Sequence, residues 1–121
     1  MINHIDIVSI PVSDQDRAKA FYRDVLGFEE LADNRMMPGM RWVQLGPRGT
    51  TTSVTLVTWF DSMPAGSLRG LVLNTDDIDA AADDLRTKGV RTSPIESQPW
   101  ARFVTFSDPD GNGLVLQQRV G

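Results

Sequence analysis

The sequence predicts an α+β fold in which two tandem βαβββ modules form a curved sheet around a concave cleft, with the helices outside. Each half of the 121-residue chain opens with an apolar strand-like segment, continues with a segment of helical period and ends in further strand-like segments. Both helical segments begin with the same spacing, Asp-x-Asp-x-Ala, at Asp14 and at Asp77. One helix for four strands leaves one sheet face uncovered, so two such units are expected to curve together.

The first module is expected to span residues 1–60. The segment "IDIVSIPV" alternates like a strand, although Pro11 cannot donate a ladder hydrogen bond and indicates an edge or an irregularity. Asp14 is a good N-cap for the helix that follows, and Gly27 is the expected stop residue. The apolar stripe of this helix consists of Ala18, Phe21, Tyr22, Val25 and Leu26. The segments "MRWVQLGPRG" and "SVTLVTWF" then predict strands.

The second module, residues 69–121, follows a connector at residues 61–68 and repeats this pattern. A short strand in "RGLVLN" precedes an acidic cap at Asp76 or Asp77, and Gly89 ends the helix. The helical stripe consists of Ile78, Ala81, Ala82 and Leu85. Strands are expected in "ARFVTFS" and "GLVLQQRV", and the "DPDG" between them predicts a hairpin turn. In this alignment of the two halves Arg41 corresponds to Arg102.

Composition limits the classes of function. Hydrophobic residues make up 40% of the chain and charged residues 23%, which is typical of a soluble globular domain. The absence of cysteine excludes disulfides, thiolate metal sites and cysteine nucleophiles. A net charge of −4 argues against nucleic acid or an anionic membrane as partner, because phosphate contacts need clustered Lys and Arg. No secretory signal is visible in "MINHIDIVS", so a cytoplasmic location is the expectation.

The stretches "IPVSDQDRAKAFYRDVLGFEE" and "FSDPDGNGLVLQQ" resemble the vicinal oxygen chelate superfamily. This superfamily includes glyoxalase I, extradiol dioxygenases, and fosfomycin and bleomycin resistance proteins. The resemblance covers essentially the whole chain and implies the paired βαβββ fold. It says less about function, because the matching residues are mostly caps, turns and core.

The resemblance also implies where a metal would be held. Metal-dependent members carry His or Glu at four strand positions, which fall here on Ile7, Thr55, Gly70 and Val115. None of these is a normal ligand for a divalent cation. His4, the only histidine, lies three residues before the first position, and an odd offset on a strand turns it to the other face. We therefore expect no metal and no cofactor, with His4 structural or simply exposed.

No convincing catalytic constellation is visible, whereas aromatic and soft apolar residues gather around the expected cleft. The predicted ligand-binding residues are Ile7, Ser9, Met37, Met40, Trp42, Thr55, Val57, Trp59, Phe60, Trp100, Phe103 and Val115. The alternative for the tryptophans and methionines is that they fill the core or a dimer interface. Gln44, Thr55, Asn74, Thr105 and Gln117 are candidates for orienting hydrogen bonds.

These observations favour a metal-independent protein that binds and sequesters a hydrophobic or aromatic small molecule, as bleomycin resistance proteins do, without chemical change. The resemblance also implies a homodimer. One alternative is a glyoxalase- or dioxygenase-like lyase or isomerase that acts without the usual metal site. Another is an interaction or regulatory domain with a vestigial cavity.

Overall fold

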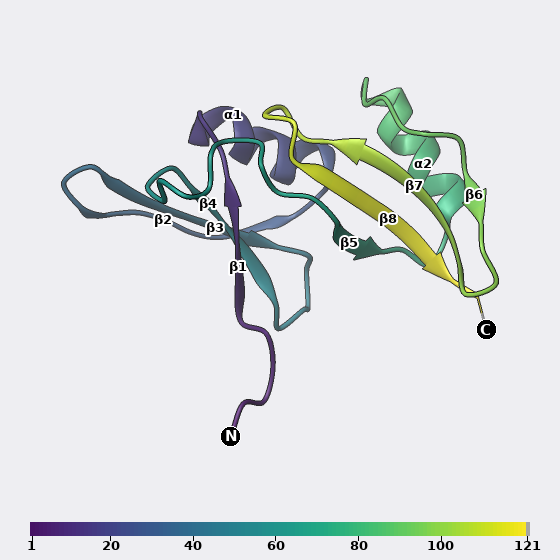
Figure 1. The fold of residues 1–121 in the computed structure, drawn as a ribbon, viewed down its shortest axis with the longest axis horizontal. Helices are drawn as coiled ribbons and strands as arrows, with labels where there is room; N and C mark the ends of the chain where they lie inside the picture. The colour runs from purple at the N-terminus through teal and green to yellow at the C-terminus, as the bar shows by residue number, and fades with distance from the viewer. Residues whose placement is uncertain (121) are drawn as a thin grey trace.

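The computed structural model describes residues 1–120 and contains two four-stranded sheets (Figure 1). The first sheet has the spatial order β1 (Ile7–Pro11), β4 (Ser53–Val57), β3 (Met40–Gly46) and β2 (Glu29–Met37). The second has the order β5 (Leu71–Asn74), β8 (Gly113–Arg119), β7 (Ala101–Ser107) and β6 (Glu96–Ser97). The neighbouring strands β1 and β4 are parallel, as are β5 and β8, and the other pairs are antiparallel. The expected α+β fold of two βαβββ modules is therefore confirmed.

Helix α1 (Gln15–Ala20) begins as the sequence predicts, because the Asp14 carboxylate accepts a hydrogen bond from the Arg17 backbone N–H at 3.1 Å. The prediction of one regular helix up to Gly27 is wrong in its second half, which is a π-helical turn, η1 (Phe21–Val25). There the Leu26 N–H donates to the Phe21 carbonyl, five residues back. This wider turn lets two consecutive aromatic side chains, Phe21 and Tyr22, both pack on the core.

Helix α2 (Ile78–Thr87) follows the prediction closely. Asp77, not Asp76, is the N-cap, and its carboxylate accepts from the Ala80 N–H at 3.1 Å. The chain leaves this helix through Gly89 at φ 87°, as it leaves η1 through Gly27 at φ 77°. No helix within residues 1–120 is both long enough and apolar enough to span a bilayer.

Each helix covers one face of its own sheet. The packed face of the first sheet joins α1 and η1 in a core of buried side chains: Ile10, Val12, Ala18, Tyr22, Phe28, Val43, Leu45, Val54 and Leu56. Leu85, Phe106 and Leu114 of the second module continue this core, so the two modules share it. A smaller cluster holds α2 on the second sheet through Ile78, Ala82 and Val104.

The turn between β7 and β8 is the predicted hairpin, and it also joins the two modules beside α1 (Figure 1). Tyr22 is fully buried and donates its hydroxyl to Asp108 at 2.8 Å. Burial, with the adjacent Asp108 charge, raises the pKa of Tyr22 far above its ordinary value. Asn112 is also fully buried; its amide donates to the Pro11 carbonyl at 2.8 Å and accepts from the Leu68 N–H at 3.0 Å.

Two strand predictions differ from the structure at their ends. The first strand begins at Ile7 and not at Ile5, which is 69% exposed. The strand expected over residues 53–60 ends at Val57, because the chain then turns, with the Met63 N–H donating to the Phe60 carbonyl. Trp59 therefore follows the strand and does not belong to it.

Candidate functional site

The face of the first sheet opposite α1 carries several of the predicted ligand-binding residues. Side chains alternate along a strand, and Val43, Val54 and Leu56 pack toward α1. Their neighbours therefore point to the other side, on which no helix of residues 1–120 packs. We call this side the aromatic face; it is formed by Ile7, Ser9, Met40, Trp42, Gln44, Ser53, Thr55 and Val57. The strand register agrees, since Ser9 pairs with Thr55, Thr55 with Gln44, and Ile7 with Ser53.

An aromatic row lies at the end of this face. The rings of Trp42 and Trp59 are stacked, with centroids 6.3 Å apart and planes 24° from parallel. Phe60 continues the row at 6.1 Å from Trp59 and is 45% exposed. Trp42 comes from β3, whereas the other two lie in the segment after β4. The row therefore combines a ring held by the sheet with two rings on a connecting segment.

A chain of hydrogen bonds fixes the first ring of the row. The Trp42 indole N–H donates to Gln44 Oε1 at 3.0 Å, and Gln44 Nε2 donates to Ser53 Oγ at 2.8 Å. The buried Thr55 hydroxyl donates to the Val43 carbonyl at 3.1 Å. Because the indole nitrogen is already bonded, Trp42 offers mainly its ring for contact with a ligand. Ser53 was not among the sequence candidates, although it alternates with Thr55 and Val57 on one strand.

Three of the five methionines, Met36, Met37 and Met40, lie at the tip of the β2–β3 hairpin, which projects away from the second sheet (Figure 1). Met37 and Met40 pair across this tip. Met37 is 56% exposed, whereas Met40 is half-buried and alternates with Trp42, so it lies on the aromatic face. The tip therefore extends that face with flexible thioether side chains.

Three predicted site residues lie elsewhere, in the second module. Phe103 and Val115 pair with Gln117 and Thr105 on the face of the second sheet opposite α2. Trp100 precedes β7 and is 67% exposed, with its carbonyl accepting the Val120 N–H. Within residues 1–120 no strand of one sheet pairs with a strand of the other. One chain therefore carries the twelve predicted residues as two separate groups.

The positions expected to hold a metal have apolar or non-ligating side chains in the structure too. Ile7 and Thr55 lie on the aromatic face, Gly70 precedes β5, and Val115 lies on β8. Among residues 1–120 no three His, Asp or Glu side chains form a group that could hold a metal ion. His4 lies outside the strand, donates from Nδ1 to Asn3 Oδ1 at 2.7 Å, and has a 45% exposed side chain. The expectation that His4 is structural or exposed is thus confirmed.

Charge is concentrated on the helix side of the first sheet. Arg41 donates from Nε and Nη2 to the two carboxylate oxygens of Asp33, both at 2.8 Å, and Lys19 donates to Asp33 at 2.8 Å. These hydrogen bonds, first of all those from Arg41, hold the pKa of Asp33 well below its ordinary range. None of the eight residues that define the aromatic face on the other side is ionisable. This face is therefore suited to a neutral, apolar ligand.

Three comparisons connect this geometry to known proteins. The model of the family described as the Glyoxalase/Bleomycin resistance protein/Dioxygenase superfamily matches residues 2–116. The crystal structure of TnmS3, an antibiotic binding protein from Streptomyces sp. CB03234, is similar with a TM-score of 0.95 and 49% identity, covering 98% of each chain.

Two curated relatives match most of the chain. YetH of Bacillus subtilis, which has no assigned function in its name, is 34% identical over 98% of this chain and 100% of its own length. The mitochondrial methylmalonyl-CoA epimerase of Mus musculus is 30% identical over 95% of this chain and 69% of its own length. Proteins similar to this one thus include both a binding protein and an enzyme.

Proposed function

Because the chain belongs to the Glyoxalase/Bleomycin resistance protein/Dioxygenase superfamily, we propose that it binds a hydrophobic, aromatic small molecule and sequesters it without chemical change. The observation that carries this proposal is the row of Trp42, Trp59 and Phe60 at the end of an uncharged sheet face. Large aromatic side chains supply contact area at little entropic cost and stack on flat ligands. The similarity to an antibiotic-binding protein over nearly the whole chain supports an antibiotic as the ligand class.

We further propose that binding needs no metal and that the binding-competent form is a homodimer. None of the residues at the four metal positions is a normal ligand for a divalent cation, which supports the first point. A second copy could bring Phe103, Val115 and Trp100 of one chain opposite the aromatic face of the other. Sedimentation of the purified protein and elemental analysis test these two points. A monomer, or one bound divalent metal per chain, would contradict them.

The binding test is a calorimetric titration with an anthracycline, a tetracycline and bleomycin as probes. We expect a stoichiometric complex with at least one aromatic probe, and recovery of the unchanged compound by mass spectrometry. Trp59→Leu removes the middle ring of the row and should weaken binding about tenfold, the value of one good aromatic contact. Leu31→Ala is the control, because it removes an exposed apolar side chain of β2 that belongs to neither group of predicted site residues. Equal losses in the two variants would argue against the aromatic row as the centre of the site.

The second candidate is a metal-independent lyase or isomerase, which the relationship to methylmalonyl-CoA epimerase favours. An enzyme of this kind needs an acid–base pair at the ligand, and the aromatic face offers only the hydroxyls of Ser9, Ser53 and Thr55. Incubation with the ligand in deuterated water distinguishes the two functions. Exchange of a substrate proton that depends on the protein would support the enzyme, whereas an unchanged ligand supports sequestration.

A further inference from the structure

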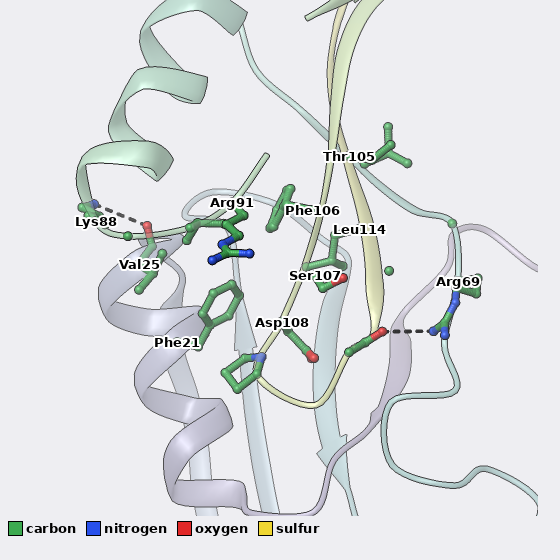
Figure 2. A pocket seen from close by; sticks show the side chains of 17 residues that line it. Phe21, Val25, Arg69, Lys88, Arg91, Thr105, Phe106, Ser107, Asp108 and Leu114 are labelled. Carbon is green, nitrogen blue, oxygen red and sulfur yellow. Dashed lines mark hydrogen bonds between the residues drawn. The ribbon is translucent and has the colours of Figure 1, made fainter. Parts of the chain in front are cut away.

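A cavity separate from the aromatic face lies elsewhere in the chain. It has a volume of about 890 Å³, which is within the range of small-molecule sites. It lies where the end of η1, the segment after α2 and the ends of β7 and β8 meet (Figure 2). Val115 is the one predicted ligand-binding residue in its lining. We call it the second cavity.

The second cavity has an apolar wall and a cationic rim. Its wall includes the side chains of Phe21, Val25, Val90, Phe106 and Leu114, and its basic residues are Arg69, Lys88 and Arg91. The acidic residue of the lining, Asp108, is turned into the module junction, where the Tyr22 hydroxyl and the Asn112 amide donate to its Oδ2. The free charge at the rim is thus positive on a chain whose net charge is −4.

The three basic residues are not equally engaged. Lys88 donates to Asp84 at 2.9 Å and to the Val25 carbonyl at 3.3 Å, so its charge is compensated. Arg69 is held by its Nη1, which donates to the carbonyls of Gly66, Leu68 and Gly111. Arg91 makes no hydrogen bond or ion pair with any of residues 1–120.

The Arg91 side chain points to where its positive charge can meet a ligand. Figure 2 shows its side chain reaching into the second cavity between Phe21 and Phe106, while Arg69 stands at the other end. Phe21 and Val90 are half-buried, so their apolar surface remains open to a bound molecule. A guanidinium beside aromatic rings binds a carboxylate through paired N–H groups, while the rings hold a flat apolar body.

We propose that the second cavity binds a planar aromatic carboxylate, with Arg91 pairing the carboxylate and the half-buried Phe21 and Val90 holding the ring. This site differs from the aromatic face in both charge and place, and it does not depend on the proposed sequestration function. An inorganic anion satisfies only the cationic part of this lining, and a neutral hydrocarbon satisfies only the apolar part. The cavity therefore selects ligands that carry both an apolar body and a negative charge.

The probes are 2-naphthoate and its neutral isostere 2-naphthamide, titrated into the full chain by calorimetry. We expect the naphthoate to bind at least about tenfold more tightly, because only the carboxylate pairs with the guanidinium. Arg91→Gln should remove this difference. Arg35→Gln is the matched control, since it removes the charge of an exposed arginine on β2 in the other module and should leave the difference intact. Equal binding of the two probes, or equal effects of the two variants, would overturn the proposal.

Amide and indole NMR signals separate this site from the aromatic face. Naphthoate is expected to shift the backbone amides of residues 88–91 and 105–107 and to leave the indole N–H signals of Trp42 and Trp59 in place. Shifts of the indole signals alone would assign the probe to the aromatic face and overturn the second site. Failure of the three antibiotic probes to bind would contradict the proposed function but would not affect the naphthoate result.

Discussion

Replacing Asn112 with alanine tests whether the junction between the modules stabilises the whole fold. The side chain is fully buried and takes part in three hydrogen bonds: its amide donates to Pro11 O and to Asp108 Oδ2, both at 2.8 Å, and its Oδ1 accepts from the Leu68 N–H at 3.0 Å. Two of these are neutral, worth about 1 kcal/mol each, and the bond to the carboxylate is worth about 1.5–3 kcal/mol. We therefore expect Asn112→Ala to lower the free energy of unfolding by about 3.5–5 kcal/mol.

This loss is large for a chain of 121 residues, whose total free energy of unfolding is expected to be roughly 6–18 kcal/mol. Urea unfolding followed by circular dichroism measures it, with Asn34→Ala as the control. Asn34 is exposed on β2, and its replacement should change the free energy by less than about 0.5 kcal/mol. A loss below about 1 kcal/mol for Asn112→Ala would refute the assignment of the turn as a junction that holds the modules together.

Two further variants probe the charged cluster and the connector. Asp33→Asn should lower the free energy of unfolding by about 1–2 kcal/mol at neutral pH. Because the fold lowers the pKa of Asp33, this loss should be constant above about pH 4, the ordinary pKa of an aspartate, and should shrink below it. Unfolding measured as a function of pH checks this. A cost that grows on acidification would contradict the ion pair with Arg41. Gly66→Ala should cost about 3 kcal/mol or more by thermal unfolding, since the residue has φ 82° and its Cβ would meet Asp110 O at 2.1 Å. Gly49→Ala, at φ 79° but in open space, should cost only about 1 kcal/mol.

The internal repeat seen in the sequence extends in the structure to individual side-chain contacts. The two halves match Asp16 with Asp79 in their helix motifs, and Arg41 with Arg102 in their strands. In the structure Arg41 donates to Asp16 at 2.8 Å, and Arg102 donates to both oxygens of Asp79 at 3.0 and 3.1 Å. Helix capping places the aspartate and strand alternation places the arginine on the same side of the sheet. The same sequence pattern in both halves therefore gives the same ion pair.

Features that depend on distant parts of the chain could not be predicted in this way. The apolar spacing from Phe21 onward predicted a regular α-helix, whereas the structure has a π-helical turn there. The Tyr22 hydroxyl donates to Asp108, which lies 86 residues further along the chain. Asn112 looks like an ordinary turn residue, and its bond to Pro11, 101 residues away, follows only from how the modules meet. For the candidate site, the alternation of β3 and β4 predicted which residues share a face. The stacking of Trp59 on Trp42 depends on a turn after Val57 that no local pattern indicated.

The two modules diverge where their second strands differ, and the two candidate sites follow from this divergence. β2 has nine residues and pairs along β3, so the first sheet extends to the hairpin tip where Met37 and Met40 lengthen the aromatic face. β6 has two residues and pairs only with Arg102 and Phe103, and beyond it Ser93 covers β7 at Thr105. The remainder of β7, Phe106 and Ser107, therefore has no neighbouring strand on that side, and there the second cavity opens toward Arg91. A duplicated unit has thus kept its core and caps while its second strand has given each half a different surface.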